Sequence, residues 1–169
     1  MPVEAVYGVA SARHPGGRLI PSMSSATTPA GYIASVSSQF SADHTGWKAM
    51  VLPPRTAVGW IAANQIRPVW IAIEFPFRAF IDGYVLDPWW VDNFPSRTPT
   101  AWLLQGSNDG TEWFILDSRA GQTWPSISES RTYSVADPGA YKKYRLWVTD
   151  NGGNSYVALG QFQLIGRRA

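Results

Sequence analysis

The sequence predicts an all-β protein built as a β-sandwich or jelly roll, and three observations lead to this prediction. In residues 101–116, AWLLQGSNDGTEWFIL, two short apolar runs flank Ser107-Asn108-Asp109-Gly110, which is the pattern of a β-hairpin. Other short apolar runs recur along the chain between segments rich in Pro, Gly, Asn and Asp. Finally, no stretch of ten or more residues has a clean helical period.

The hairpin itself requires a partner layer. Trp102 and Leu104 fall on one side of its first strand, and Trp113 and Ile115 fall on one side of its second strand. A hairpin on its own buries too little surface to be stable in water. We therefore expect further strands to pack over these side chains, which gives a sandwich.

The remaining expected elements are short apolar runs bounded by turn residues. Residues 47–50 suit an edge segment or a short helical turn, and residues 87–99 form a loop that contains Pro88, Pro95 and Pro99. The other strands are expected at residues 32–36, 70–75, 81–86, 131–135, 143–148 and 157–165.

The chain of 169 residues has the length of one domain. Residues 1–22 show no sustained periodicity and contain His14-Pro15-Gly16-Gly17. We expect residues 1–22 to be an N-terminal arm or linker and residues 23–169 to be the sandwich domain.

Composition excludes several classes of protein. There is no Cys, so disulfides, thiolate catalysis and cysteine-ligated zinc are ruled out. A net charge of +2 without a basic stripe argues against nucleic-acid binding. The sequence has no apolar run of about 18 residues, so we expect no membrane insertion. The first residues, MPVE, lack the basic and apolar pattern of a secretory signal peptide.

The sequence also lacks the residue patterns of common catalytic sites. Nucleophilic catalysis needs a base beside the nucleophile, and the only histidines are His14, in the expected arm, and His44. Asp87 and Asp92 are close in sequence, but a small sandwich rarely forms the deep cleft that a glycosidase uses. Phosphate-binding Gly loops and metal-ligating His clusters are absent from the sequence. We therefore predict no enzymatic activity and no cofactor.

The loop at residues 87–99 is the best candidate for a ligand site. Trp89-Trp90 could supply an aromatic plate for the apolar face of a sugar ring, because adjacent residues in an extended chain point in opposite directions. Asn93 and Arg97 in the same loop offer donors for hydroxyl groups. The alternative is that both tryptophans cap the end of the sandwich. The five tryptophans expected in the core are Trp47, Trp70, Trp102, Trp113 and Trp147.

Several segments occur in an order known from one family. They are Trp47-Lys48-Ala49, WIAIEF, IDGYVL, WLLQGSNDGTEW, RTYSVADPGAYKKYRL and QFQLIG. Over about residues 23–166 the chain resembles the discoidin or coagulation-factor type C domain, a galactose-binding-like jelly roll shared with bacterial carbohydrate-binding modules. It is most similar to cysteine-free versions from bacteria and phage-like particles.

The resemblance implies further site residues. In carbohydrate-binding relatives a His from the first loops contacts a sugar hydroxyl, and His44 is the matching position; otherwise it is a solvated turn residue. Relatives also place an aromatic residue in the late Asn/Gly loop, where Tyr156 stands. The candidate ligand-binding residues are therefore His44, Trp89, Trp90, Asn93, Arg97 and Tyr156.

The chain departs from the family at two places. Family members hold a structural calcium ion with an Ala-x-Asp-Gly segment and a Glu in the last strand, whereas this sequence has Ala49-Met50-Val51-Leu52 and Gln161. Calcium prefers several oxygen ligands that include carboxylates, so we predict no metal. Sugar-binding relatives also often place an Arg after the GYVL strand, where this chain continues with DPWW, so a sugar site would be built differently.

Two functional hypotheses follow. The first is a non-catalytic carbohydrate-binding module that recognises a cell-surface glycan or capsular polysaccharide, as a spike, tail or other virion component in host attachment. The second is a structural protein–protein docking domain of a virion or cell-surface assembly, without sugar binding. Both hypotheses can hold together if residues 1–22 bind other subunits of the particle. We expect the protein on the surface of a virion or phage-like particle, or outside the cell after non-classical export.

Overall fold

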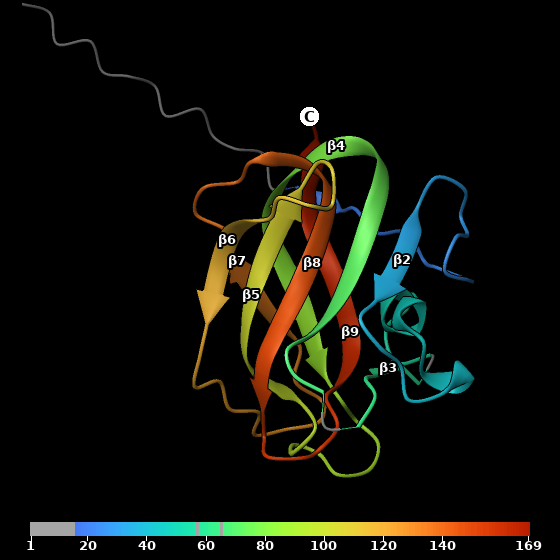
Figure 1. Ribbon diagram of the computed structural model, residues 1–169, viewed down its shortest axis with the longest axis vertical. Coiled ribbons are helices and arrows are strands. Elements are labelled where there is room, and N and C mark those ends of the chain that lie inside the picture. Colours follow the sequence, from blue (N-terminus) through green and yellow to red (C-terminus); the bar gives the residue numbers. More distant parts are fainter. Residues whose placement is uncertain (1–15, 57, 65) are drawn as a thin grey trace, which may run out of the picture.

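The computed structural model describes residues 16–56, 58–64 and 66–169, whose antiparallel strands form two facing layers (Figure 1). The first layer contains, in order, β2 (Ile33–Val36), the first half of β4 (Val69–Pro88), β8 (Ala140–Asn151), β5 (Pro99–Ser107) and β6 (Phe114–Arg119). The second contains β7 (Arg131–Ser134), the second half of β4, β9 (Ala158–Arg168) and, along the free edge of β9, β1 (Gly17–Arg18) and β3 (Trp60–Ile61). The prediction of an all-β jelly-roll sandwich is confirmed.

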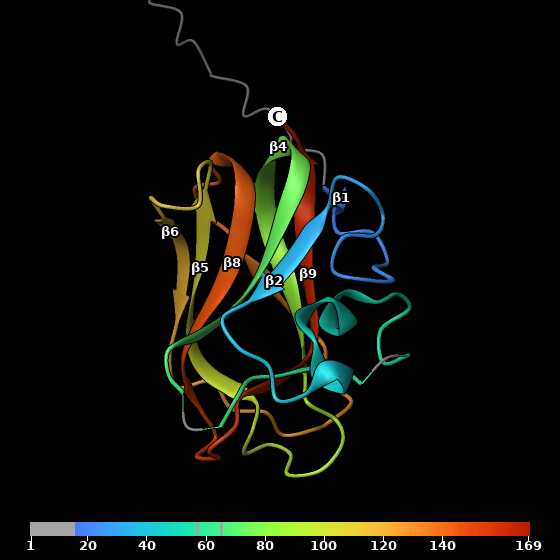
Figure 2. The same ribbon diagram turned by 45° about the vertical axis from the view of Figure 1, so that its right-hand side comes forward.

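Strand β4 belongs to both layers. The sequence predicted two separate strands, one before and one after Pro76. The structure instead has one strand that bends over from one layer to the other (Figure 2). The pairing with β8 shifts register between Glu74 and Ala79, because a proline cannot donate to the ladder and interrupts it. The first half therefore pairs with β8 in one layer, and the second half pairs with β9 in the other.

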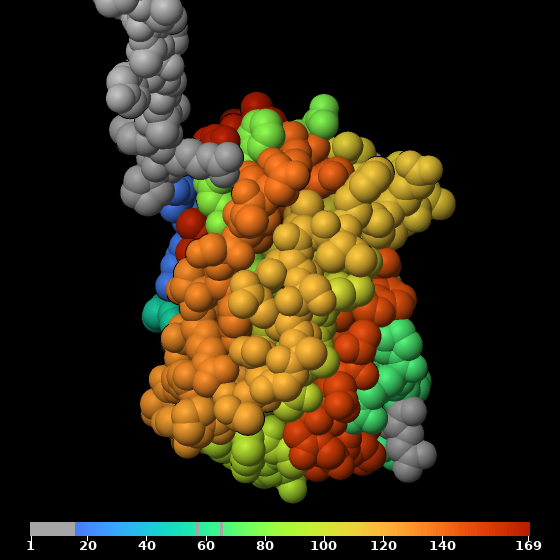
Figure 3. Space-filling model, turned by 90° about the vertical axis from the view of Figure 1, so that its left-hand side faces the viewer, coloured from blue at the N-terminus to red at the C-terminus, as the bar shows by residue number. Residues whose placement is uncertain are grey.

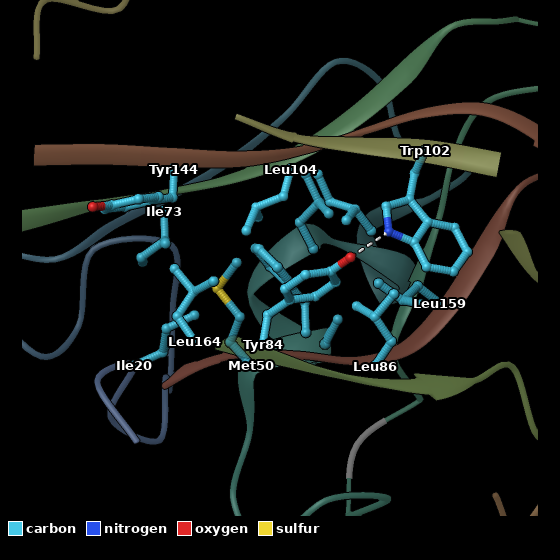
Figure 4. Close-up of a cluster of buried hydrophobic side chains, with 14 of the residues drawn as sticks. Ile20, Met50, Ile73, Tyr84, Leu86, Trp102, Leu104, Tyr144, Leu159 and Leu164 are labelled. Atoms are coloured by element: carbon cyan, nitrogen blue, oxygen red, sulfur yellow. Dashed lines mark hydrogen bonds between the residues drawn. The ribbon is translucent and has the colours of Figure 1, made fainter. Parts of the chain in front are cut away.

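The core lies between the two layers. Trp102, Leu104 and Tyr144 project from the first layer towards Tyr84 and Leu164 of the second (Figure 4). The first hairpin strand is thus covered as expected, since Trp102 and Leu104 are buried. The second strand, β6, is the outer strand of the layer and leaves Ile115 60% exposed.

The expectation that five tryptophans belong to the core is wrong for three of them, because only Trp102 lies within the core and only Trp47 packs against it. Trp102 is buried, but the other four are only half-buried. Trp70 and Trp147 face each other across β4 and β8, on the side of the layer that points away from the core. Their strand neighbours Ile71 and Leu146 take the inward positions, so alternation along each strand places the indoles outside. The four half-buried residues are Trp47, Trp70, Trp113 and Trp147.

Residues 1–15 of the expected arm lie outside the described residues. Residues 16–22, which the sequence assigned to the same arm, belong to the sandwich instead. Gly17 and Arg18 pair with β9, and Ile20 is buried with its backbone N–H bonded to the Gln163 side chain. The body therefore begins before residue 23.

The short helical segments lie beside the sandwich. They are the 3₁₀ helices η1 (Ala42–His44) and η2 (Gly46–Met50), and η2 agrees with the helical turn expected near residues 47–50. Within the described ranges, no helix has the length and apolar character needed to cross a bilayer.

Candidate functional site

The candidate ligand-binding residues lie at the end of the sandwich where β4 stops, which is the lower end in Figure 1. Residues 89–98 follow β4, and residues 152–157 connect β8 to β9. These two loops meet the segment that carries Phe40 and η1.

Trp89 is buried at this end of the sandwich and does not expose an aromatic face to a ligand. Its side chain is 1% exposed, its indole N–H donates to the Asp92 carbonyl at 2.9 Å, and its backbone N–H donates to the Thr98 hydroxyl at 3.3 Å. Trp90 is half-buried and stacks on Trp89 with ring centroids 6.2 Å apart. It packs against Gly160 and lies 5.7 Å from the Arg55 guanidinium. One of the two tryptophans is thus buried and the other is partly exposed.

The open aromatic surface is formed by Phe40 and Tyr156. Their rings meet edge to face with centroids 5.3 Å apart, and Phe40 is 53% exposed. Together with Ile61 and Arg97 they line a shallow hollow of about 140 Å³. This is smaller than the roughly 300–1,000 Å³ of pockets that enclose a drug-sized ligand, so the hollow suits a single ring or a chain end.

A charged pair lies beside these rings. The Arg97 guanidinium carbon is 5.3 Å from the Tyr156 ring centroid, and one of its terminal nitrogens is 3.1 Å from an Asp92 carboxylate oxygen. Asp92 keeps 61% of its side chain exposed, whereas Arg97 keeps 15%. The Arg97 Nε is buried without a hydrogen-bond partner among the described residues. Fixed donors and an exposed acceptor therefore stand next to an aromatic face, which suits a ligand with adjacent hydroxyl groups.

His44 lies beside the aromatic rings of Phe40 and Trp89. Its ring lies 5.7 Å from the Phe40 ring and 6.0 Å from the Trp89 ring, and its Nδ1 is 2.8 Å from the Ser41 hydroxyl. Burial lowers the pKa of His44 and outweighs the opposite effect of Asp43. The imidazole is therefore neutral at pH 7 and can either donate or accept a hydrogen bond.

Two of the six candidate residues, Arg97 and Tyr156, line the hollow. His44 and Trp89 lie behind its lining, because His44 contacts Phe40 and buried Trp89 packs with Ile61. Asn93 lies on the outer rim, where it takes a left-handed conformation (φ 56°) and donates to the Asp92 carboxylate at 3.0 Å. Trp90 lies on the other side of Trp89, over Gly160.

Sequence reasoning missed three residues of this cluster. Ile61 belongs to β3, a two-residue strand too short to show a pattern. Asp92 lies in the expected loop, but a lone Asp among turn residues gives no signal for ligand binding in the sequence. Phe40 carried the clearest overlooked signal, because it is a lone large aromatic residue between two polar segments, SSQ and SADHTG.

Hydrogen bonds between the loops hold the cluster in place. The Asn151 carboxamide donates to the carbonyls of Asn154 at 3.1 Å and Tyr156 at 2.6 Å, and the Tyr156 N–H donates to the Asn154 side chain. The Ala158 N–H donates to the Arg97 carbonyl at 2.8 Å, which ties the two loops to each other. The side chains around the hollow are therefore pre-organised before any ligand arrives.

At the position that the resemblance assigns to calcium, the Asp87 Oδ1 and Gln161 Oε1 oxygens are buried without a hydrogen-bond partner among the described residues. The Gln161 amide nitrogen lies 3.5 Å from the Val51 carbonyl, and Gln161 pairs across the strands with buried Asp87. The Asp87 carboxylate also faces a guanidinium, with Arg55 Nε at 3.7 Å. Calcium requires six to eight oxygen ligands, including carboxylates. In the described part of the chain, no three His, Cys, Asp or Glu side chains are grouped to hold a metal.

We compared the chain with known protein families, sequences and structures. No family model matches the chain. A peptide-N(4)-(N-acetyl-β-glucosaminyl)asparagine amidase of Arabidopsis thaliana is 26% identical over 110 residues. That match covers 62% of this chain but only 15% of the amidase.

Solved structures are similar over more of the chain. Chitosan-binding module 2 of the chitosanase/glucanase from Paenibacillus sp. IK-5, in complex with chitotriose, has a TM-score of 0.65 and 23% identity, covering 80% of this chain and 97% of the module. A CBM32 module of Clostridium perfringens, in complex with GalNAc-β-1,3-galactose, has a TM-score of 0.64 and 13% identity, covering 80% of this chain and 95% of the module. The chain therefore has the galactose-binding-like jelly-roll fold of the discoidin-type domains.

Proposed function

We propose that this chain is a non-catalytic glycan-binding module whose ligand sits in the hollow between Phe40 and Tyr156. The observation that carries this proposal is the Arg97–Asp92 pair held directly beside two aromatic rings on cross-braced loops. The apolar face of a sugar ring would pack on Tyr156, while Arg97 donates to one hydroxyl and Asp92 accepts from its neighbour. His44 would contact a third hydroxyl.

The comparisons support sugar as the ligand class. The two solved structures above contain chitotriose and GalNAc-β-1,3-galactose, and the plant amidase is named for an N-acetylglucosaminyl substrate. These oligosaccharides are therefore the first probes for this chain. The small hollow matches recognition of one terminal residue better than recognition of a long internal stretch.

A binding role accounts for the site better than catalysis does. Glycoside hydrolysis needs two carboxyl groups on opposite sides of the scissile bond. The described residues that line the hollow are Phe40, Ile61, Arg97 and Tyr156, and none of them carries a carboxylate. The neighbouring carboxylate, Asp92, is engaged by Arg97.

We further propose that the natural ligand is a cell-surface glycan or capsular polysaccharide, and that the module serves host attachment on a virion or phage-like particle. A shallow site binds weakly, and display in many copies raises avidity by orders of magnitude without new contacts. Docking of the N-terminal residues to other subunits of such a particle stays a prediction.

Calorimetric titration of the full chain with chitotriose and with GalNAc-β-1,3-galactose tests the site. We expect at least one of the two to bind, and Tyr156→Ala and Phe40→Ala each to weaken that binding by about tenfold, since an aromatic plate contributes on the order of 1 kcal/mol beyond its buried area. The matched control is Phe114→Ala, which removes a 51% exposed aromatic ring from β6. Equal affinities for all three variants would show that the sugar binds elsewhere.

A further inference from the structure

A second concave surface lies on the outer face of the first layer. It is separate from the hollow lined by Phe40, Ile61, Arg97 and Tyr156, called the loop-end hollow below. Strands β2, β4, β8 and β5 turn this face towards the viewer in Figure 1. Alternation along β4 and β8 places Trp70, Arg145 and Trp147 on it, while Leu146 points into the core. None of these outward residues belongs to the proposed sugar site.

This face holds a hollow of about 220 Å³ with both aromatic and charged walls. The turn between β5 and β6 projects past the sheet at the upper right of Figure 3, and it brings Gly110 and Trp113 over the face. The walls are completed by strand residues, chiefly Ser35, Trp70, Glu74, Lys143 and Arg145. A concave surface on paired strands is rigid, as a binding site requires.

Arg145 is the unusual residue of the hollow. Its guanidinium carbon lies 4.0 Å from the Trp113 ring centroid and 4.3 Å from the Trp147 ring centroid. Its Nε donates to the Gln105 side chain at 2.7 Å, which is a neutral partner. Within the described ranges Arg145 forms no ion pair, although burial disfavours its charge enough to lower its pKa. A partly desolvated guanidinium that contacts two indole rings and has no counter-ion among the described residues is suited to receive an anion.

The charged residues near Arg145 also favour an anionic ligand. Glu74 is the one carboxylate among the described residues that line the hollow, and it pairs with Lys142 at 3.2 Å and Lys143 at 3.3 Å. Burial raises the pKa of Glu74, but hydrogen bonds and charges from these two lysines outweigh it and lower the pKa. Among the described residues that line the hollow, two cations (Lys143 and Arg145) against one carboxylate (Glu74) leave a formal surplus of one positive charge.

We propose that the outer-face hollow is a second ligand site, for an acidic sugar residue of a polysaccharide. The uronate carboxylate would pair with Arg145, and the sugar ring would lie against Trp70 and Trp113. The hollow is the size of a small ligand group and is walled by charges, whereas a protein interface needs about 1,000 Å² of buried surface with an apolar centre. The proposal does not depend on the loop-end site.

Titration of the full chain with tri-galacturonic acid tests this second site, with the methyl-esterified trimer as the neutral counterpart. We expect the acid to bind at least about tenfold more tightly than the ester, because the ester lacks the negative charge that would pair with Arg145. Arg145→Gln and Trp70→Ala should each weaken binding of the acid by about tenfold. Tyr156→Ala should leave it unchanged, which separates this site from the proposed loop-end site.

The matched charge control is Arg168→Gln, which removes an exposed arginine at the end of β9. If it weakens binding as much as Arg145→Gln does, the interaction is non-specific charge attraction and the proposal is wrong. Equal binding of acid and ester, or equally tight binding of triglutamate, would also overturn it. Because Arg145 contacts two indole rings, thermal melts should accompany each titration. If Arg145→Gln does not fold, Trp70→Ala and Lys143→Gln carry the test.

Discussion

Tyr84 joins the two layers of the sandwich through a polar group in the middle of an apolar core. Its hydroxyl accepts the Trp102 indole N–H at 2.9 Å and donates to the Asp117 carboxylate at 2.6 Å (Figure 4 shows the first of these bonds). Asp117 is in turn held by Arg119 at 2.9 Å. Burial, reinforced by Asp117, raises the pKa of Tyr84, so the hydroxyl stays protonated and keeps its donor role. A chain of polar groups thus fixes how the layers are aligned.

Tyr84→Phe should destabilise the protein by about 1–3 kcal/mol, because it leaves the buried Trp102 N–H without an acceptor. Chemical denaturation followed by tryptophan fluorescence measures this change. Tyr32→Phe is the matched control, since the Tyr32 hydroxyl is only partly buried and makes no hydrogen bond to the described residues. If the two variants are equally stable, the polar link between the layers contributes nothing.

At the scale of elements, the β5–β6 hairpin shows what the sequence could and could not predict. The turn predicted at Ser107–Gly110 falls at the β5–β6 connection, where Gly110 takes a positive φ of 82° and Asp109 caps the turn. The connection itself spans residues 108–113, so Trp113 precedes the second strand. Alternation along a strand predicts which residues share a face, but it does not predict whether another layer covers that face. The exposure of Ile115 was therefore not predictable. Trp147 was misplaced for the same reason.

The hairpin turn should loosen in acid through Asp109. Backbone N–H groups of Thr111 and Glu112 bond its carboxylate and lower its pKa from 3.8 to about 2. A carboxylate whose pKa is lower in the folded state than in the unfolded state stabilises the fold at any pH above its unfolded-state pKa. That stabilisation is lost as the pH falls through the folded-state pKa. Thermal melts should therefore show wild type losing stability from about pH 4 to about pH 2, with a flatter profile for Asp109→Asn. Identical slopes for both proteins would contradict this role.

At the scale of the whole molecule, the fold was predictable because short strands, turn residues and family-ordered segments all indicated one sandwich. The prolines and adjacent indoles of the loop that carries Trp89 and Arg97 indicated it as a candidate site, and this stays a prediction. Which indole faces outward was not predictable, because tertiary packing buries Trp89 against Asp92 and Thr98. Phe40 reaches the site from a segment about 50 residues earlier in the chain, and only the fold brings it there.

We propose that one end of this sandwich binds a glycan in the loop-end hollow, and backbone NMR of the full chain, titrated with chitotriose and GalNAc-β-1,3-galactose, can locate the bound sugar. We expect the largest shift changes in Phe40, Asp92, Arg97 and Tyr156, with β6 unaffected. Shifts confined to the outer face of the first layer, or no shifts with either sugar, would show that this end is not the glycan site.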